Sequence, residues 1–384
     1  MSEQDLSPSD EVPPRSARRR GVGKGSKFMV LGRDNMQKLF SAPTSNRMNF
    51  VLTFLLLLAG TGADHRHTKW SAKACEQKLG IGRPRATTAI VELAQAGLLS
   101  IADTHTPAKP HYVLSPPSAE TDEIFLPIQL VTGFGDDTPI LRRLRESGDV
   151  TALRIFLGLY GSVQLDATYG ASIEQFRADC AEGSNASKSV FDRGIYRLWS
   201  LSWPDTHRAS PDWVAAILGV SKPTQSMMNN FWESFQKLSS IGAVKIQYWV
   251  FDSGDVTAEP LFPVDRYRLF EGGSDAQVEL MQAVYFASHS FLGDESYIYD
   301  QHEGSLLLPL PSHFATPHIR GVLTPTVTPD SPGHRRSFAL CMKSLNHFAA
   351  EYSVCAKSFS QGIHSQPLRT MPGLGEGDGQ QDPF

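Results

Sequence analysis

The sequence predicts a mainly α-helical protein with short β hairpins, which places it in the α+β class. Three observations support this prediction. The stretch Trp70–Leu99 has the pattern of two helices joined by a tight turn and followed by a strand. A second stretch, Ser210–Pro223, repeats the first half of that pattern without a gap. Apolar residues then recur at helical spacing along Arg335–Lys357, which predicts a long amphipathic helix.

Residues 1–27 are predicted to form a disordered basic arm, because they combine low hydrophobicity with many Ser, Pro, Gly and basic side chains. Phe28–Leu31 follows as a short strand and Asn35–Phe40 as a short helix. Asn49–Ala59 is a strongly apolar helix that is too short to span a bilayer. We expect it to be the buried first helix of a domain that covers residues 28–114.

The stretch Trp70–Leu99 carries clear helix boundaries. Ser71 is a suitable N-cap, and Gly80 ends the first helix because glycine adopts the left-handed conformation cheaply. Pro84 suits the first turn of a second helix, which Gly97 ends. The apolar face of that second helix, with spacings of four and three, consists of Ala86, Ile90 and Leu93.

A predicted hairpin follows, in which strands Leu98–Ile101 and His111–Leu114 flank the polar loop Thr104–Pro110. A helix–turn–helix followed by a hairpin is a winged helix. The segment LGIGRPRATTAIVELAQAGLL resembles the helix–turn–helix of winged-helix regulators of the MarR and GntR kind. It is also similar to the amino-terminal domains of plasmid and phage replication initiators. The resemblance covers residues 47–114 and departs from the common pattern at Gly82, where Ser or Thr is usual.

The resemblance implies a bacterial protein that binds double-stranded DNA by placing its second helix in the major groove. Side chains off the apolar face would meet bases and phosphates, the wing loop and the turn before the first helix would meet phosphate, and the arm would add electrostatic attraction. The corresponding candidates are Arg83, Arg85, Thr87, Thr88, Lys109, His105, Lys69, Arg18, Arg19 and Arg20.

Charge is unevenly distributed along the chain. Between Arg15 and Leu114 there are 16 Lys and Arg against 5 Asp and Glu. From Ser115 to Phe384 the balance reverses, with 20 against 31. A basic head on an acidic body is expected of a protein that docks one end on a polyanion.

Residues 115–123 read as a linker and 124–264 as a second winged-helix-like module with an insertion. The ungapped repeat rests on identical Ser, Leu, Gly and Pro residues (Ser71/Ser210, Leu79/Leu218, Gly80/Gly219 and Pro84/Pro223). Gly242 would end the second helix of this module. The spacing between glycines predicts that this helix is about six residues longer than the corresponding helix of the first copy. Strands Ala243–Phe251 and Leu261–Val264 would complete a hairpin.

Two segments are candidates for the first helix of this second module. This helix is either Val150–Leu165, capped by Asp149, or Lys188–Leu201; Ser172–Ala181 is predicted to be a further helix. Apolar bulk in the module's second helix (Met227, Met228, Phe231 and Trp232) and the acidic loop Asp252–Asp255 argue against phosphate contact. We therefore expect this module to be mainly structural or dimerising.

The carboxy-terminal region, residues 265–357, is predicted to be α/β. It would contain a helix at residues 275–292, a strand at Ser305–Leu310 and an irregular Pro/Thr-rich segment, Pro311–Pro332. The long helix Arg335–Lys357 is either a homodimer element or packs on its own domain. Residues 358–384 are predicted to be disordered.

Enzymatic function is not expected, because no nucleophile elbow, paired-carboxylate motif, dinucleotide fingerprint or metal-ligand cluster is present. We expect no cofactor and no metal. The amino terminus lacks a signal peptide and the four cysteines form no CxxC pair, which favours a cytoplasmic protein without membrane contact. Three functions remain: a transcriptional regulator, a plasmid or phage replication initiator that binds origin repeats, and a protein-interaction adaptor without DNA.

Overall fold

The computed structural model describes residues 28–62, 64–106, 108–116, 123–182, 184–255, 257–266 and 275–362. It is a mixed α+β structure built from helices and several small antiparallel sheets. The predicted α+β class is confirmed, although two strands of eight residues each exceed the short hairpins that the sequence suggested. The amino-terminal arm with Arg18, Arg19 and Arg20 lies outside the described residues, as does most of the predicted tail.

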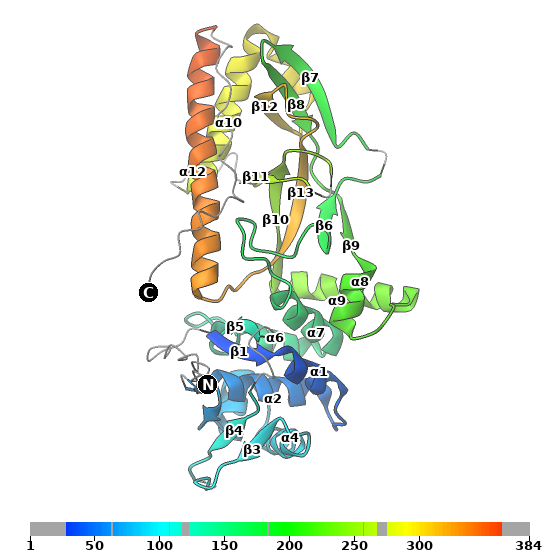
Figure 1. Cartoon of the computed structure of the whole chain (residues 1–384), viewed down its shortest axis with the longest axis vertical. Coiled ribbons are helices and arrows are strands. Elements are labelled where there is room, and N and C mark those ends of the chain that lie inside the picture. Colours follow the sequence, from blue (N-terminus) through cyan, green and yellow to red (C-terminus); the bar gives the residue numbers. More distant parts are fainter. Residues whose placement is uncertain are drawn as a thin grey trace, which may run out of the picture.

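The first unit occupies the lower end of the molecule in Figure 1. Its elements are β1 (Phe28–Gly32), α1 (Arg33–Ser41), α2 (Arg47–Ala59), β2 (His67–Thr68), α3 (Ala72–Ala74), α4 (Arg83–Gln95), β3 (Leu99–Ile101), β4 (Tyr112–Leu114), β5 (Glu123–Pro127) and α5 (Gln129–Thr132). Helix α3 continues directly into a π-helical turn, Cys75–Leu79. One antiparallel sheet has the order β2-β4-β3, and β5 returns to pair with β1.

The second unit follows in the chain and lies above the first (Figure 1). Its elements are α6 (Ile140–Ser147), α7 (Val150–Tyr160), β6 (Phe176–Asp179), β7 (Ser187–Arg193), β8 (Tyr196–Leu201), β9 (Thr206–Ala209), α8 (Pro211–Leu218), α9 (Gln225–Ser240), β10 (Val244–Phe251), β11 (Pro260–Val264) and β13 (His318–Pro325). Its main sheet has the order β11-β10-β13-β6-β9.

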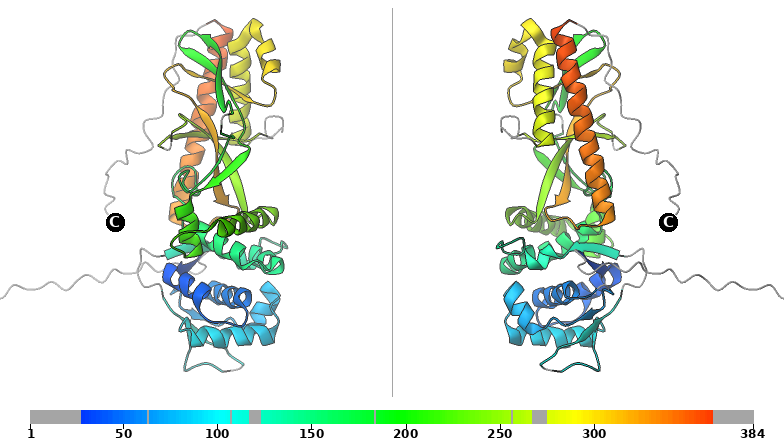
Figure 2. Two further views of the ribbon diagram at one scale, coloured as in Figure 1. Left: turned by 90° about the vertical axis from the view of Figure 1, so that its right-hand side faces the viewer. Right: turned by 90° about the vertical axis from the view of Figure 1, so that its left-hand side faces the viewer.

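The carboxy-terminal region consists of α10 (Ala276–Leu292), the 3-10 turn Gly293–Glu295, α11 (Tyr297–Gln301), β12 (Leu306–Pro311) and α12 (Pro332–Ser360). Strand β12 pairs with the β7–β8 hairpin in the order β12-β8-β7. Helices α10 and α12 run side by side along the molecule (Figures 1 and 2). Because α12 continues to Ser360, the predicted tail begins later than residue 358.

Helix α2 is the centre of the first unit's core. Every residue from Met48 to Ala59 is buried, and Asn46 caps its first turn by accepting a hydrogen bond from the Asn49 amide at 3.0 Å. Helix α7 has the same role in the second unit, where the Asp149 carboxylate accepts from the Ala152 amide at 2.9 Å. Apolar burial of both helices is therefore combined with a satisfied helix start.

Two segments differ from the sequence-based predictions. Ser172–Ala181 contains strand β6 rather than a helix, because buried Phe176 and Ala178 alternate with half-buried Arg177 and Asp179 at the two-residue period of a strand. Pro311–Pro332 is not irregular throughout, since it contains β13, which pairs with β10 along eight residues. Its prolines end the strand rather than interrupt it.

Of the two alternatives for the opening helix of the second module, Val150–Leu165 contains helix α7, whereas Lys188–Leu201 is the β7–β8 hairpin. Helix α7 ends at Tyr160 rather than Leu165. The predicted six-residue extension of the second helix was wrong. Helix α9 has 16 residues and α4 has 13, because Thr224 caps α9 by accepting from the Met227 amide, and this lengthens the turn before it.

The two units share their helix ends. Gly80 and Gly219 end α3 and α8 with φ of +67° and +64°, while Gly97 and Gly242 follow α4 and α9 with φ of +68° and +67°. These are left-handed conformations that glycine adopts without steric cost. The two units therefore end these helices in the same backbone conformation, and one of the two glycine pairs, Gly80 and Gly219, belongs to the ungapped sequence repeat.

Helix α6 joins the two units by hydrogen bonds to both. Arg145 donates to the Leu79 carbonyl at the end of the first unit's α3 segment, at 3.1 Å. Arg143 donates to the Ile241 carbonyl at the end of the second unit's α9, at 2.5 Å. Basic side chains at the carboxyl ends of helices also interact favourably with the helix dipoles. One continuous apolar core runs through the first unit and the helices α6 to α9 of the second.

Candidate nucleic-acid interface

Helix α4 has one buried and one exposed face. Ala86, Ala89, Ile90 and Leu93 are buried, and the helix packs against α2. The opposite face, which no described element covers, presents the exposed residues Arg85, Thr87, Thr88, Val91 and Gln95. Helix α4 and the β3–β4 hairpin lie at the lower end of the molecule in Figure 1.

Arg83 and Arg85 have different surroundings although both are exposed. The Arg83 Nε donates to Glu76 Oε2 at 2.7 Å, with side-chain exposures of 59% and 44%. Among the described residues Arg85 has no ion-pair partner, and it lines a shallow hollow with Asn46, Asn49 and Thr88. Arg85 is therefore the arginine on α4 that is available to an anion without first breaking an ion pair.

Glu92 lies beside the same hollow, but its carboxylate already has partners. Thr44 donates to Oε2 at 2.5 Å and the Ser45 amide donates to Oε1 at 3.0 Å. Partial burial opposes ionisation, but these hydrogen bonds and nearby Arg47 lower the pKa of Glu92 overall. The carboxylate therefore stays ionised and is held in place by Thr44 and Ser45.

The remaining α4 candidates are positioned differently. Thr87 is exposed. The Thr88 hydroxyl donates to the Pro84 carbonyl at 3.1 Å, one helical turn earlier, which leaves its lone pairs and methyl group at the surface. Gly82 is the N-cap residue and supplies no side-chain hydrogen bond. Because Gly82 provides no side-chain cap, the start of α4 is supported by Pro84, whose fixed φ suits the first helical turn.

The β3–β4 loop presents Lys109 to solvent, because a backbone pairing between Thr106 and Lys109 fixes the turn there (3.0 and 3.1 Å). His105 is turned inward instead. Its Nδ1 accepts from the His111 amide at 3.1 Å, and its ring lies 5.1 Å from that of Tyr112. Only the Nε2 of His105 is left to donate to a phosphate.

Lys69 is exposed in the turn before α3, next to the half-buried Trp70. Sequence reasoning missed Lys73, which is exposed on α3, and the Val91–Gln95 end of the α4 face. Extending the four-residue spacing from Thr87 to Val91 and Gln95 would have identified that end of the face.

The second unit's helix α9 also has an exposed polar face, which includes Gln225, Asn229, Asn230, Glu233 and Gln236. Gln225 Nε2 donates to Asn229 Oδ1 at 3.0 Å. The apolar bulk that the sequence placed on this helix faces inward: Phe231 is fully buried, and Trp232 contacts Phe176 and Phe235. Apolar side chains therefore do not dominate the exposed face of α9.

The acidic loop of the second unit serves a structural role. Asp252 accepts a hydrogen bond from the Glu259 amide at 2.9 Å. The carbonyl oxygens of Gly254 and Asp255 accept from the buried guanidinium of Arg320 in β13. This loop thus holds an internal arginine.

The described residues contain no group of three or more His, Cys, Asp and Glu that could hold a metal ion. Burial raises the pKa of Cys75, Cys180 and Cys341 to about 11, so these thiols stay protonated at neutral pH. In the same described ranges, no helix is both long and apolar enough to cross a membrane. No family model, curated protein or solved structure matches the chain.

Proposed function

We propose that the two units are winged helices and that the chain binds double-stranded DNA, with α4 as the helix that enters the major groove. The exposed face of α4 carries this proposal. It is long enough to follow a groove, it lies at one end of the molecule, and its Arg85 has no ion-pair partner among the described residues.

The side chains on this face match known modes of base and phosphate contact. Arg85 can form a bidentate contact with guanine, Gln95 with adenine, and the Thr88 and Val91 methyl groups can meet thymine methyls. Lys69, Lys73 and Lys109 flank the helix and would contact phosphates, which position the protein on the duplex. Transcriptional regulation is the use of such binding that we favour.

The test is selection of bound duplexes from random DNA, followed by titration of the best site with single variants. Arg85→Ala should weaken specific binding by about 1–3 kcal/mol and relax the preference at one base pair. Arg336→Ala is the matched control, because it removes an exposed arginine of α12, outside the first unit. Equal affinities for the two variants would contradict the role of Arg85, and the absence of salt-sensitive binding to any duplex would favour the adaptor.

A second candidate function is initiation of replication at repeated DNA sites. It is favoured by the duplication of the unit and by the amide side chains on α9, since Asn and Gln pair bidentately with adenine. Helices α4 and α9 lie at different heights along the long axis (Figure 1), so they would contact separate segments of a duplex.

This candidate predicts a footprint longer than one winged helix covers, over tandem repeats near an origin. Asn229→Ala together with Asn230→Ala should then shorten the footprint and leave the α4 half-site protected. An unchanged footprint, over a single operator beside a promoter, would leave the regulator as the better description.

A further inference from the structure

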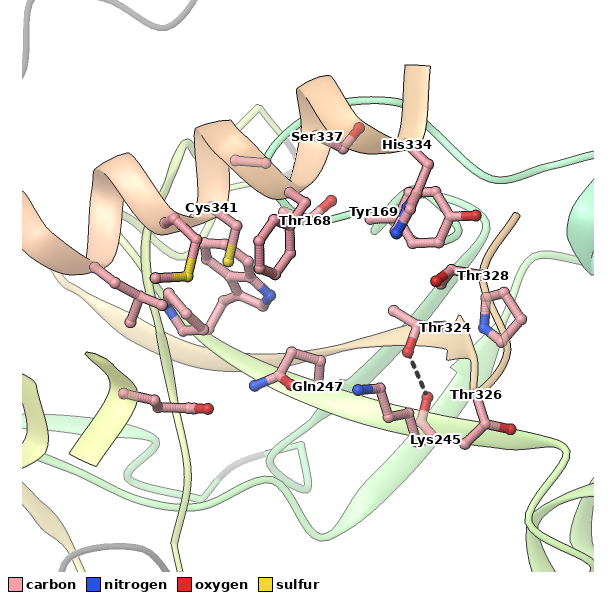
Figure 3. A pocket seen from close by; sticks show the side chains of 18 of the residues that line it. Thr168, Tyr169, Lys245, Gln247, Thr324, Thr326, Thr328, His334, Ser337 and Cys341 are labelled. Carbon is pink, nitrogen blue, oxygen red and sulfur yellow. Dashed lines mark hydrogen bonds between the residues drawn. The ribbon is translucent and has the colours of Figure 1, made fainter. Parts of the chain in front are cut away.

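A cavity of about 390 Å³ lies between the main sheet of the second unit and the first turns of α12. Figure 3 shows Ser337, His334 and Cys341 on α12 along one wall, and Gln247, Lys245 and Thr324 on the opposite wall. Thr168 and Tyr169 contribute from the loop before β6. Its volume falls within the range of small-molecule binding sites.

Several polar atoms that line this cavity are buried without a hydrogen-bond partner among the described residues. Ser337 is 0% exposed and Trp249 is 1% exposed, and neither the Ser337 Oγ nor the Trp249 Nε1 has a partner. The same holds for His334 Nδ1 and Gln277 Nε2. Buried polar groups in folded proteins are paired with protein, water or ligand atoms, so four such groups around one cavity indicate that water or a ligand pairs with them.

The available groups are mainly hydrogen-bond donors. The Trp249 indole and the Gln277 amide nitrogen can only donate, and the Ser337 hydroxyl can donate as well. Lys245 adds a cation at the exposed side of the cavity, with no ion-pair partner in the described ranges. Asp275 also lines the cavity, and its carboxylate accepts a hydrogen bond from the Gln277 backbone amide at 3.0 Å. A ligand that fits the part of the wall around Lys245, Ser337 and Trp249 is rich in acceptors and carries negative charge.

Three flat side chains also line the cavity. Trp249, Phe338 and Tyr169 line the cavity, and the rings of Tyr169 and His334 lie 4.3 Å apart. Tyr169 has a φ of +43°, a left-handed backbone conformation that is unfavourable for a bulky side chain. Such conformations concentrate where a fold positions side chains for a ligand. Burial lowers the pKa of His334, so its ring is neutral at neutral pH.

We propose that this cavity binds a small organic anion with a planar ring, whose carboxylate or phosphate pairs with Lys245 and whose other acceptor atoms take hydrogen bonds from Ser337 and Trp249. The ring would lie against the aromatic part of the wall. The elements β10, β13 and α12, which line the cavity, lie higher along the long axis than α4 in Figure 1, and the proposal does not depend on DNA binding. The cavity joins β10, β13 and α12, so an occupant would tie the second unit to the carboxy-terminal region.

The test uses the full chain and two planar anions, salicylate and adenosine 5′-monophosphate, titrated by calorimetry. Their neutral counterparts, salicylamide and adenosine, and inorganic phosphate alone are titrated in parallel. We expect at least one planar anion to bind saturably, and its neutral counterpart and phosphate to bind at least tenfold more weakly. An aromatic carboxylate and a nucleotide are thereby distinguished as sources of the anion.

Two serines on α12 provide a matched pair of variants. Ser337 and Ser344 are both 0% exposed, but the Ser344 hydroxyl donates to the Leu261 carbonyl at 2.5 Å. Ser337→Ala should weaken anion binding at least tenfold without lowering the melting temperature of the free protein. Ser344→Ala should lower the melting temperature and leave the affinity of the folded protein unchanged. Lys245→Ala should weaken binding like Ser337→Ala, whereas Arg85→Ala should leave it unchanged.

Several outcomes would overturn the proposal. They are the absence of saturable binding by both anions, equal binding of the neutral counterparts, or unchanged anion affinity in Ser337→Ala and Lys245→Ala. A loss of anion binding in Arg85→Ala alone would also overturn it, because the anion would then occupy the α4 surface.

Discussion

The hydroxyl of Thr326 donates a hydrogen bond to the carbonyl oxygen of Gly242 at 2.5 Å, across 84 residues of chain. In the first unit Ser115 makes the same bond to Gly97 at 2.7 Å, across 18 residues. The backbone hydrogen bonds show the same correspondence. The Ser115 amide donates to the Leu98 carbonyl at 3.0 Å, and the Thr326 amide donates to the Ala243 carbonyl at 3.1 Å. Strand β13 is therefore the counterpart of β4, and β11, α10, α11 and β12 are inserted between the paired strands of the second unit.

The glycines that end α4 and α9 should be intolerant of a side chain. Gly242→Ala and Gly97→Ala should each lower the free energy of unfolding by about 1–2 kcal/mol, because both positions have positive φ. Gly82→Ser is the control, since its φ is −55° and a Cβ there would meet no atom within 4 Å. It should raise stability by a few tenths of a kcal/mol by adding a cap. Urea unfolding measures all three, and a stabilising Gly242→Ala would contradict the shared helix end.

Asp149 should stabilise the second unit through its charge as well as its cap. It caps α7, accepts from Ser234 at 3.0 Å and pairs with Lys237 at 2.8 Å. Asp149→Ala should lower the free energy of unfolding by about 1–2 kcal/mol. Asp149→Asn keeps a capping oxygen but removes the negative charge, so its effect on the free energy of unfolding measures the contribution of the charge alone.

The pH dependence of that contribution has a definite sign. Desolvation opposes ionisation of Asp149, but hydrogen bonds from Lys237, Ala152 and Ser234 outweigh it and lower the pKa overall. The unfolded chain therefore binds the proton more tightly. The stabilisation is present above the ordinary Asp pKa of about 4 and is lost as pH falls through the lower folded-state value. Urea unfolding of wild type and Asp149→Asn at several pH values measures this contribution. If the difference in free energy of unfolding did not shrink as the pH is lowered, this assignment would be wrong.

Glu76 should limit DNA affinity by holding Arg83. In Glu76→Gln the Arg83 guanidinium becomes available to phosphate, and one negative charge is lost. The affinity for any duplex should therefore rise, and the salt dependence of that affinity should steepen by about one phosphate contact. Stability should change little, because exposed ion pairs contribute about 0–1 kcal/mol. Fluorescence anisotropy at several salt concentrations measures the effect, with Glu146→Gln on α6 as the control for loss of charge elsewhere. Weaker binding by Glu76→Gln would instead assign Glu76 to the contact itself.

Helix α6 should contribute to the free energy of unfolding through its hydrogen bonds to both units. Arg145→Ala removes the bond to Leu79 and should cost about 1.5–3 kcal/mol, the range for hydrogen bonds to charged groups. Arg142→Ala on the same helix loses only an exposed pair with Glu146 and should cost less than 1 kcal/mol. Limited proteolysis should detect loosening of the first unit in Arg145→Ala. Equal unfolding midpoints for the two variants would argue against this bridge.

Local signals made the first unit predictable. Gly80, Pro84 and Gly97 fix the helix ends within one short stretch, and the apolar face of α4 follows from its spacing alone. The same features made the repeat at Ser210–Pro223 visible. The candidates on α4 are at its surface, as the spacing predicted, whereas the inward turn of His105 depends on the fold of a loop around Tyr112 and His111.

By itself, the sequence determined the helix ends of the first unit and the duplicated turn, because those depend on residues only a few positions apart. Tertiary structure decided the strand assignments of β6 and β13, since each strand is stabilised by partners distant in the chain, as in the single pairing of Gly321 with Ala178. It also turned Phe231 inward and assembled the cavity from Tyr169, Lys245 and Ser337. No periodicity encodes those contacts, because they form only when the sheet and α12 have packed.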